Sequence, residues 1–409
     1  MSRIDDLIRD LCPDGVKFRT LEEIFETRNG YTPSKNDVKA WAGNDIPWFR
    51  MDDIRSHGRI LRDATQRISK SAVKGGRTFP ADSILVATSA TIGEHALVRV
   101  PHLSNQRFTN LALKDNFKGS FDAKFLFYYC FKLDEWCLKN TTTSSFSSVD
   151  MKGFKNFKFP IPPLEVQNEI TRTLDQFTQL EAELEAELEA RRQQYTYYRK
   201  LLIKNASQDA PLVRLRDLGA WHGGITPPKK RSDFWDSPDI HWLTPKDMST
   251  EAVVSTVDHV SSKALTKTSL KYLPKNCIAF VFRSNILRRK LPIAIVHPRV
   301  TLNQDMRALV ARKDISANYV AEVCLAQQNF LRSHFVRTDG SMAAVDSKAL
   351  FNHKIPVPPL KKQEQVSNQL AAFRTIATDL TSGLPAEIEA RRKQYEYYRD
   401  RLLTFPEKN

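Results

Sequence analysis

The residues of this sequence that could do chemistry are mostly charged, and one small set has the spacing of a metal-dependent nuclease. Pro13-Asp14 is followed by Asp37-Val-Lys39. Such a carboxylate–carboxylate–lysine set can bind a divalent metal and activate water. The pattern is short and degenerate, and Asp14 lies in a turn sequence, so a structural role is the stronger interpretation. A freestanding metal-dependent nuclease is kept as an alternative.

Motifs for the other common chemistries are absent from the sequence. There is no G-x-x-x-x-G-K-[ST], G-x-G-x-x-G or H-E-x-x-H motif, and no Asn-Pro-Pro-aromatic segment, in which amino-methyltransferases hold a flipped base. The nine histidines are dispersed, and the five cysteines form no C-x-x-C pair. With no signal peptide and no apolar run of about 18 residues, the sequence predicts a reduced, cytoplasmic protein without a membrane span, metal or catalytic residue.

The positive charge is confined to two segments. The 409 residues include 62 Lys and Arg against 47 Asp and Glu, a net charge of +15. Residues 160–204 and 355–409 together are neutral, whereas residues 1–159 carry +6 and residues 205–354 carry +9. Two basic domains, each large enough to bury its own core, are thus expected to face a polyanion.

An internal repeat arranges these segments. LEARRQQYTYYR at 188–199 recurs as IEARRKQYEYYR at 388–399, and FPIPPL at 159–164 recurs as IPVPPL at 355–360. Weaker matches relate the two basic segments at an offset of 194. The predicted order is domain, helix, domain, helix, with boundaries at 1–159, 160–204, 205–354 and 355–409.

Each neutral segment is predicted to be one long helix. Apolar residues recur three or four apart from Ile170 to Leu202 and again from Val366 to Leu402, which makes two stripes of about 60 Å. Proline inside a helix removes a hydrogen bond, so Ser-Gly-Leu-Pro at 382–385 predicts a kink or break. Two such stripes are most simply buried against each other as an antiparallel coiled coil.

The basic segments are predicted to contain both helices and strands. Residues 82–88 and 276–282 are apolar, β-branched and aromatic runs typical of buried strands, whereas 121–138 and 316–335 have a helical pattern. The predicted fold class is α+β: two mixed α/β domains separated by two long antiparallel helices that form a coiled coil. Positions matched between the domains should be scaffold, so Trp41 with Trp235, and Trp48 with Trp242, are predicted to pack rather than to stack on bases.

These features together resemble the specificity subunit of type I restriction-modification systems. The resemblance is carried by the two Pro-x-Pro-Pro-Leu segments, the two helix ends Glu-Ala-Arg-Arg-x-Gln-Tyr-x-Tyr-Tyr-Arg, the paired Gly-x-Thr-Pro and Asn-Gln segments, and the opening Leu11-Cys-Pro-Asp-Gly-Val16. It covers nearly the whole chain. It implies that residues 1–159 and 205–354 are target recognition domains, each reading one half of a bipartite site in double-stranded DNA.

The resemblance also implies partners and chemistry. The helices would separate the domains and dock two methyltransferase (modification) subunits. The assembly would methylate adenines and, with restriction subunits, cleave DNA. The family's specificity subunit has no chemistry of its own, so S-adenosylmethionine and ATP are expected on the partner subunits and no cofactor in this chain. A tandem-domain structural adaptor is the remaining alternative.

The repeat also selects candidate DNA contacts, because polar positions that differ between the domains can read different half-sites. Arg50 stands opposite Thr244, and Asp52 opposite Lys246; arginine suits guanine, whereas Asn or Gln suits adenine. Other basic side chains are expected at phosphates. The candidates are Lys35, Arg50, Arg67, Lys70, Lys74, Arg77, Ser89, Thr91, Thr141, Lys229, Lys230, Arg231, Lys246, Lys263, Lys267, Arg283, Asn285, Arg288, Arg289, Lys290 and Ser341.

The repeated helix ends are the candidate docking surface for two identical partner subunits, since tyrosine rings supply large buried areas at interfaces. The alternative is that the tyrosines on the apolar stripe only close the ends of the coiled coil. The candidate partner-binding residues are Arg191, Arg192, Tyr195, Tyr197, Tyr198, Arg391, Arg392, Tyr395, Tyr397 and Tyr398.

Overall fold

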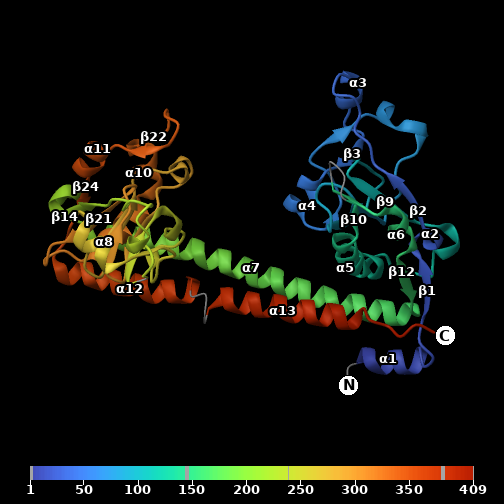
Figure 1. Ribbon diagram of the computed structural model, residues 1–409. Coiled ribbons are helices and arrows are strands. Elements are labelled where there is room, and N and C mark those ends of the chain that lie inside the picture. The colour runs from blue at the N-terminus through green and yellow to red at the C-terminus, as the bar shows by residue number, and fades with distance from the viewer. Residues whose placement is uncertain (1–2, 143–146, 238, 379–382, 409) are drawn as a thin grey trace. The chain divides into compact units, whose positions relative to one another are not determined.

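The chain forms two compact units in the computed structural model (Figure 1). The structure describes residues 3–142, 147–237, 239–378 and 383–408, without the side chains of Lys74 and residues 375–378. Unit 1 comprises Met1–Glu183 and Ile388–Asn409, and unit 2 comprises Leu184–Glu387. Each unit contains one basic domain together with parts of both long-helix segments. The boundaries between domain and helix segments expected from the sequence stay a prediction.

The two units have the same sheet topology, with a five-stranded and a three-stranded sheet in each basic domain. In unit 1 the strand orders are β2(Phe25–Asn29)-β9(Phe108–Leu113)-β6(Ser83–Ala87)-β7(His95–Val98)-β4(Ile60–Leu61) and β5(Arg67–Ile68)-β3(Ile46–Phe49)-β8(Leu103–Ser104). In unit 2 they are β14(Gly219–Gly223)-β21(Met306–Ala311)-β18(Cys277–Val281)-β19(Ile293–Val296)-β16(Ala252–Val253) and β17(His259–Val260)-β15(Ile240–Leu243)-β20(Val300–Leu302). Corresponding strand pairs also share direction, for example parallel in β4·β7 and β16·β19.

Two-stranded ribbons complete the repeat. One kind joins the start of each basic domain to its end and comprises β1(Lys17–Thr20) with β12(Lys158–Ile161), and β13(Leu212–Arg214) with β24(Lys354–Pro356). The other kind comprises β10(Thr141–Thr142) with β11(Ser148–Val149), and β22(Val336–Arg337) with β23(Ala344–Val345). The internal repeat predicted from the sequence is thus confirmed strand by strand.

The shorter helices largely follow the repeat as well. The α-helices outside the long segments are α1(Arg3–Leu11), α2(Leu21–Ile24), α3(Val38–Trp41), α4(Met51–His57), α5(Ala123–Lys139), α6(Met151–Asn156), α8(Ser262–Lys267), α9(Ala317–Ala326), α10(Gln328–Phe335) and α11(Ser347–Asn352). The 3₁₀ turns are η1(Lys70–Ala72), η2(Lys74–Gly76), η3(Asp115–Phe117), η4(Leu215–Leu218), η5(Ser232–Phe234), η6(Pro245–Asp247) and η7(Asn285–Arg288). The helix predicted at 121–138 is α5, whereas the one predicted at 316–335 is divided at Gln327 into α9 and α10.

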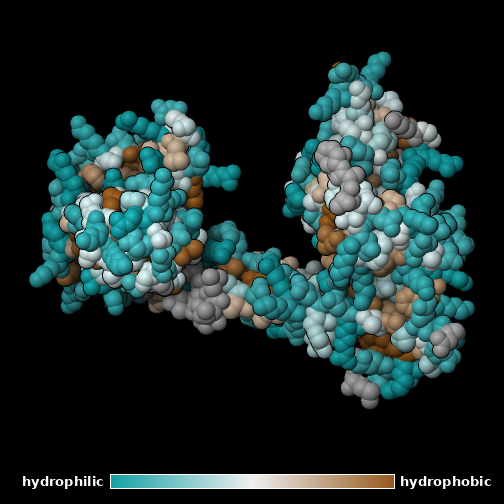
Figure 2. Space-filling view, in the orientation of Figure 1, coloured by the Kyte–Doolittle hydropathy of each residue, from teal (hydrophilic) through white to brown (hydrophobic). Residues whose placement is uncertain are grey.

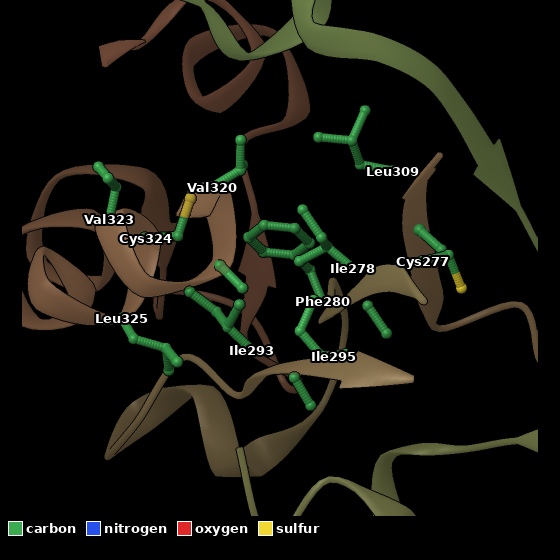
Figure 3. Packing of buried hydrophobic residues seen from close by; sticks show 14 of the residues in the cluster. Cys277, Ile278, Phe280, Ile293, Ile295, Leu309, Val320, Val323, Cys324 and Leu325 are labelled. Carbon is green, nitrogen blue, oxygen red and sulfur yellow. The ribbon is translucent and has the colours of Figure 1, made fainter. Parts of the chain in front are cut away.

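Each basic domain has a large core beneath its five-stranded sheet. In unit 2 the aromatic ring of Phe280 lies among Ile278, Ile293 and the side chains of α9, including Val320 (Figure 3). Burying such side chains is the main stabilising contribution, at about 1.5–3 kcal/mol each. A smaller core behind each three-stranded sheet is built around a tryptophan. Among the described residues, every helix is too short or too polar to cross a lipid bilayer.

The first long helix is continuous, as predicted: α7 runs from Leu164 to Ala206, 43 residues. In unit 1 it packs antiparallel to α13(Leu384–Leu402). Phe177 stacks on Tyr398 with ring centroids 5.5 Å apart, and Glu181 pairs with Arg392 at 2.6 Å. In unit 2 Tyr198 of α7 stacks on Phe373, 5.1 Å away. On the apolar stripe of α7, Ile170, Leu174 and Tyr195 are buried, the other positions are mostly half-buried, and Leu180 is 46% exposed.

The second long segment contains two helices, α12(Leu360–Thr378) and α13. Pro385 lies in the first turn of α13, where its missing N–H needs no partner. The carbonyl of Gly383 accepts the first hydrogen bonds of that turn. The predicted break at 382–385 is confirmed as a helix start at Leu384, while Ser382 lies outside the described residues.

A buried glutamine fixes the start of α7 to the basic domain of unit 1. The Gln167 side chain is fully buried. Its Oε1 accepts from the N–H of Asp122 at 2.9 Å, and its Nε2 donates to the carbonyls of Ser120 and Pro162 at 2.8 and 2.7 Å. One amide thus joins the start of α5, the Pro-Pro turn and the long helix. Gln363 makes the equivalent bonds at the start of α12.

Replacing Gln167 by alanine is expected to lower the free energy of unfolding by about 1–3 kcal/mol, because three buried backbone groups lose their partner. Urea unfolding of the full chain, followed by circular dichroism, measures the effect. Gln179→Ala on the exposed face of α7 is the matched control and should cost under about 0.5 kcal/mol. Equal losses in both variants would contradict the role given to Gln167.

His102 gives the stability of unit 1 a pH dependence. Burial lowers the pKa of its imidazole to about 4, although a hydrogen bond to the carbonyl of Val100 opposes the shift; Arg28 lowers it further. The folded protein therefore holds the ring neutral, whereas the unfolded chain protonates it below about pH 6.5. The contribution of the neutral His102 ring to the free energy of unfolding is therefore fully present above pH 6.5 and is lost as the pH falls towards 4.

Between pH 6.5 and 4 the wild-type free energy of unfolding should fall by up to about 1.4 kcal/mol per pH unit because of His102. The His102→Val variant is expected to lack this part of the fall. Valine occupies the equivalent position in unit 2. There Val300 forms a β-bridge with Leu273, as His102 does with Phe79 in unit 1. Urea unfolding at several pH values gives the slope. The exposed His57→Val variant should keep the wild-type slope; an unchanged slope in His102→Val would refute the assignment.

Candidate nucleic-acid interface

An open groove of about 610 Å³ lies in the second basic domain, beside the end of β15. Residues from four separate segments of the chain come together there. Two of them, Lys229 and Lys246, are among the DNA contacts predicted from the sequence. The amide side chains of Asn303 and Gln304 form another part of the wall. The groove is lined by Thr226, Lys229, Trp235, Trp242, Thr244, Pro245, Lys246, Asp258, Asn303 and Gln304.

The groove rests on a pair of tryptophans. Trp235 and Trp242 meet edge to face at 5.0 Å, and Trp242 is buried and donates from Nε1 to the carbonyl of Ile225. In the first domain Trp41 and Trp48 repeat the arrangement at 5.2 Å. The predicted packing role is confirmed for Trp48 and Trp242, whose rings belong to the small cores.

Thr226 and Gln304 hydrogen-bond through their side chains across the groove, as Thr32 and Gln106 do in the first domain. The sequence pairs Asn105-Gln106 with Asn303-Gln304 as scaffold, so it misses Asn303 and Gln304 as groove residues. The sequence does contain a signal for them: these polar amide residues occur in both domains and directly follow a buried strand, which is typical of residues that line a site.

A second cluster of candidates surrounds the ribbon β22·β23. The backbone of Arg283 forms a β-bridge with Ala344 of that ribbon, and its side-chain Nε donates a hydrogen bond to the carboxylate of Asp305 at 2.7 Å. Ser89 bridges to Ser148 of β10·β11 in the same way. The structure thus brings two further groups of candidates together, namely Arg283, Asn285, Arg288 and Ser341 in unit 2, and Ser89, Thr91 and Thr141 in unit 1.

Two of the arginines expected at phosphates hold loops together. Arg67 contacts the carboxylate of Asp63 and the carbonyls of Asn44 and Asp45 with its three side-chain nitrogens. Arg288 donates to the carbonyls of Thr338 and Gly340. These bonds give both arginines a structural role, and their contact with phosphates stays a prediction.

The other basic candidates are exposed on surfaces that are largely hydrophilic (Figure 2). Arg231 forms a bidentate pair with Asp233 at 2.8 Å but keeps half of its side-chain surface in solvent. The side chain of Lys74 lies outside the described residues. The exposed candidates are Lys35, Lys70, Arg77, Lys229, Lys230, Arg231, Lys246, Lys263, Lys267, Arg289 and Lys290.

The tyrosines proposed for partner docking divide into two groups. Tyr195 is only 7% exposed; its hydroxyl lies 3.2 Å from Glu322 and accepts from Arg199 at 2.9 Å. Burial raises its pKa, and that of Tyr395, to about 12. These two rings, and the half-buried Tyr198 and Tyr398, pack within the chain, which favours the packing alternative for them.

Tyr197 and Tyr397, by contrast, are 63% and 62% exposed. Arg191 and Arg192 are exposed as well, as are Arg391 and Arg392. The exposed surface of each repeated helix end therefore includes Tyr197 or Tyr397, whereas Arg392, although exposed, is paired with Glu181 of α7.

The carboxylates of the nuclease alternative have structural partners. Asp37 caps α3 by accepting from the N–H of Ala40 at 3.1 Å. Asp14 lies in a turn and pairs with Lys408 at 3.3 Å. Within the described ranges, no cluster of three or more His, Cys, Asp or Glu side chains could hold a metal ion.

Comparison with known proteins places the chain in a family. The profile of the type I restriction modification DNA specificity domain matches residues 13–190 and 209–390. The chain therefore belongs to the type I restriction-modification specificity family and carries its specificity domain twice, as the resemblance in the sequence implies.

Two relatives from Escherichia coli agree with this assignment. The specificity subunit of the type I restriction enzyme EcoR124I/EcoR124II is 34% identical over 390 residues, which are 89% of this chain and 95% of that relative. The EcoprrI specificity subunit is 59% identical over 199 residues, 46% of this chain and half of that relative's length.

A solved structure from work on the assembly and conformational transition of the type I R-M system has the same fold. It covers 95% of this chain and 97% of its own, with a TM-score of 0.63 and 15% identity.

Proposed function

We propose that this chain is the DNA-recognition subunit of a type I restriction-modification complex, and that each basic domain reads one half of a bipartite sequence in double-stranded DNA. The observation that carries the proposal is the duplicated scaffold: the same sheets hold different polar side chains in the two domains, and in the second domain these side chains line a groove. Net charges of +6 and +9 on the two domains supply the phosphate attraction that dominates DNA affinity.

In this proposal the long helices dock two modification subunits, and restriction subunits join that assembly. Two equivalent exposed surfaces, around Tyr197 and Tyr397, suit two identical partners. S-adenosylmethionine and ATP are bound by the partner subunits, and this chain contributes recognition without catalysis. Its place of action is the cytoplasm, where the DNA lies.

Exchanging residues 205–354 for the matching domain of a relative is expected to change one half-site and leave the other intact, because each basic domain has its own core and basic face. Sequencing the methylated genome of a host that carries the chimera and its partner subunits gives the new motif. A chimera that altered both half-sites at once would count against modular recognition.

Alanine at both Tyr197 and Tyr397 is expected to weaken binding of the modification subunits at least tenfold, since aromatic side chains are frequent hot spots of interfaces. Sedimentation of the mixed subunits gives the stoichiometry, and circular dichroism the helix content. Thr196→Ala with Glu396→Ala, at neighbouring exposed positions, is the control. Normal assembly of the tyrosine variant would remove the docking role.

The run LEAELEAEL at 180–188 offers a test of spacing. Removing four residues leaves the stripe within about 40° of its old direction and shortens the helix by about 6 Å. That equals nearly two base pairs at about 3.4 Å each. After deletion of residues 181–184, Glu185 takes the place of Glu181, so the pair with Arg392 can form again.

The deletion is therefore expected to keep both half-sites and shorten the unspecific spacer between them by one or two base pairs. Methylation mapping of the deletion strain measures the spacer directly. An unchanged spacer at full activity, or an altered half-site, would show that the helix does not set the separation.

A further inference from the structure

One carboxylate organises the same corner, formed by the loop after β3 or β15, in both basic domains. In unit 1 the Asp53 side chain is fully buried. Its Oδ2 accepts from the N–H of Arg50 at 2.7 Å, and its Oδ1 accepts from the N–H of Thr65 at 2.8 Å. Asp53 thus ties the loop after β3 to the loop that carries Gln66.

Unit 2 repeats both backbone contacts of this corner. Asp247 accepts from the N–H groups of Thr244 and Val257, both at 2.8 Å, and also from the hydroxyl of Thr244 at 3.0 Å. The backbone angles φ and ψ are −129° and 171° at Arg50, and −127° and 168° at Thr244. The two Cβ atoms therefore leave the backbone in the same way, although one side chain is a long cation and the other a short hydroxyl.

Gln66 and Asp258 are a second equivalent pair. The N–H of Trp48 donates to the carbonyl of Gln66 at 2.9 Å, and the N–H of Trp242 donates to that of Asp258 at 3.1 Å. The third pair, Asp52 and Lys246, follows two residues after the first. The backbone scaffold is constant, and the side chains of these three pairs differ on it.

Each corner contains one cation beside one carboxylate, but different positions supply them. In unit 1 Arg50 lies 4.0 Å from Asp52, and its buried Nε has no hydrogen-bond partner among the described residues. In unit 2 Lys246 lies 3.5 Å from Asp258, and both line the groove with Thr244. The cation of unit 2 therefore starts from a backbone position two residues after the equivalent of Arg50.

We infer that Arg50, Asp52 and Gln66 determine the sequence read by the first domain, and that Thr244, Lys246 and Asp258 determine the sequence read by the second. This inference rests on the proposed function. Arg50 and Lys246 present donors to the O6 and N7 of a guanine in the major groove, and the neighbouring carboxylate orients each cation. The guanine occupies different places in the two half-sites because the two cations start from different backbone positions.

The test is a graft of one set onto the other scaffold. The full-length variant R50T/D52K/Q66D is expressed with the modification subunits of its own system in a host without other adenine methylation, and the genome is sequenced for methylated motifs. The expected result is a change at one or two base pairs of the first half-site, with methylation of the original motif reduced at least tenfold. The second half-site and the spacer stay the same.

Lys70→Ala with Arg77→Ala is the matched control, because it removes two exposed cations of the same domain outside this corner. Its motif should be that of the wild type even if binding weakens. A graft with an unchanged motif overturns the inference. So does a folded graft that loses methylation and binding to every duplex equally, since the set would then contact phosphates only.

If thermal unfolding shows that the graft does not fold, Arg50→Lys replaces it. The Asp53 contacts use only the backbone of residue 50, so this variant keeps the corner. It should relax selection at one base pair of the first half-site about tenfold, and an unrelaxed motif overturns the inference. A wild-type host without any bipartite methylated motif would instead refute the proposed function itself.

Discussion

At the start of α7 and of α12, the side-chain amide of one buried glutamine hydrogen-bonds to backbone N–H and C=O groups that are shielded from water. The segment Pro160-Ile-Pro-Pro163 offers carbonyls but almost no N–H donors, so the strand β12 cannot extend its ladder there. Gln167 donates to Pro162 and Ser120 while accepting from Asp122. A buried amide without these partners would cost about 1–3 kcal/mol per group, so the helix, the turn and the domain hold one geometry together.

The two units use the same device there and related ion pairs further along the helices. In unit 2 Arg199 of α7 lies between the carboxylates of Glu251 and Glu322. In unit 1 the equivalent Arg399 lies over the ring of Phe131, 4.7 Å from its centroid, and pairs with Asp400 at 2.7 Å and Glu135 at 3.8 Å. A buried ion pair tolerates the loss of one partner poorly, and Glu322 is buried whereas Glu135 and Asp400 are exposed. The contact between domain and helix is therefore more demanding in unit 2.

Much of the architecture could be predicted because duplication leaves a signal in the sequence that a single domain does not. Matched tryptophans had to be scaffold, and the period of the apolar stripe predicted α7. The same period could not say whether Tyr195 is covered by its own chain or by a partner, because either burial gives an identical pattern. Asp258 was missed for another reason. Its counterpart Gln66 lies at an offset of 192, not 194, since the intervening loops differ in length.

The constancy of Asp53 and Asp247 explains how one fold can carry two recognition surfaces. Each carboxylate accepts from two backbone N–H groups, and Asp247 accepts from the hydroxyl of Thr244 as well. The two backbone contacts do not depend on the side chains at the positions they hold. Substitution at those positions changes what projects into the groove while the corner keeps its backbone hydrogen bonds and its tryptophan support. Base discrimination depends on donors held at fixed places, and here the backbone fixes the places. Stability and specificity are thus borne by different atoms of the same loop, so that one can change without loss of the other.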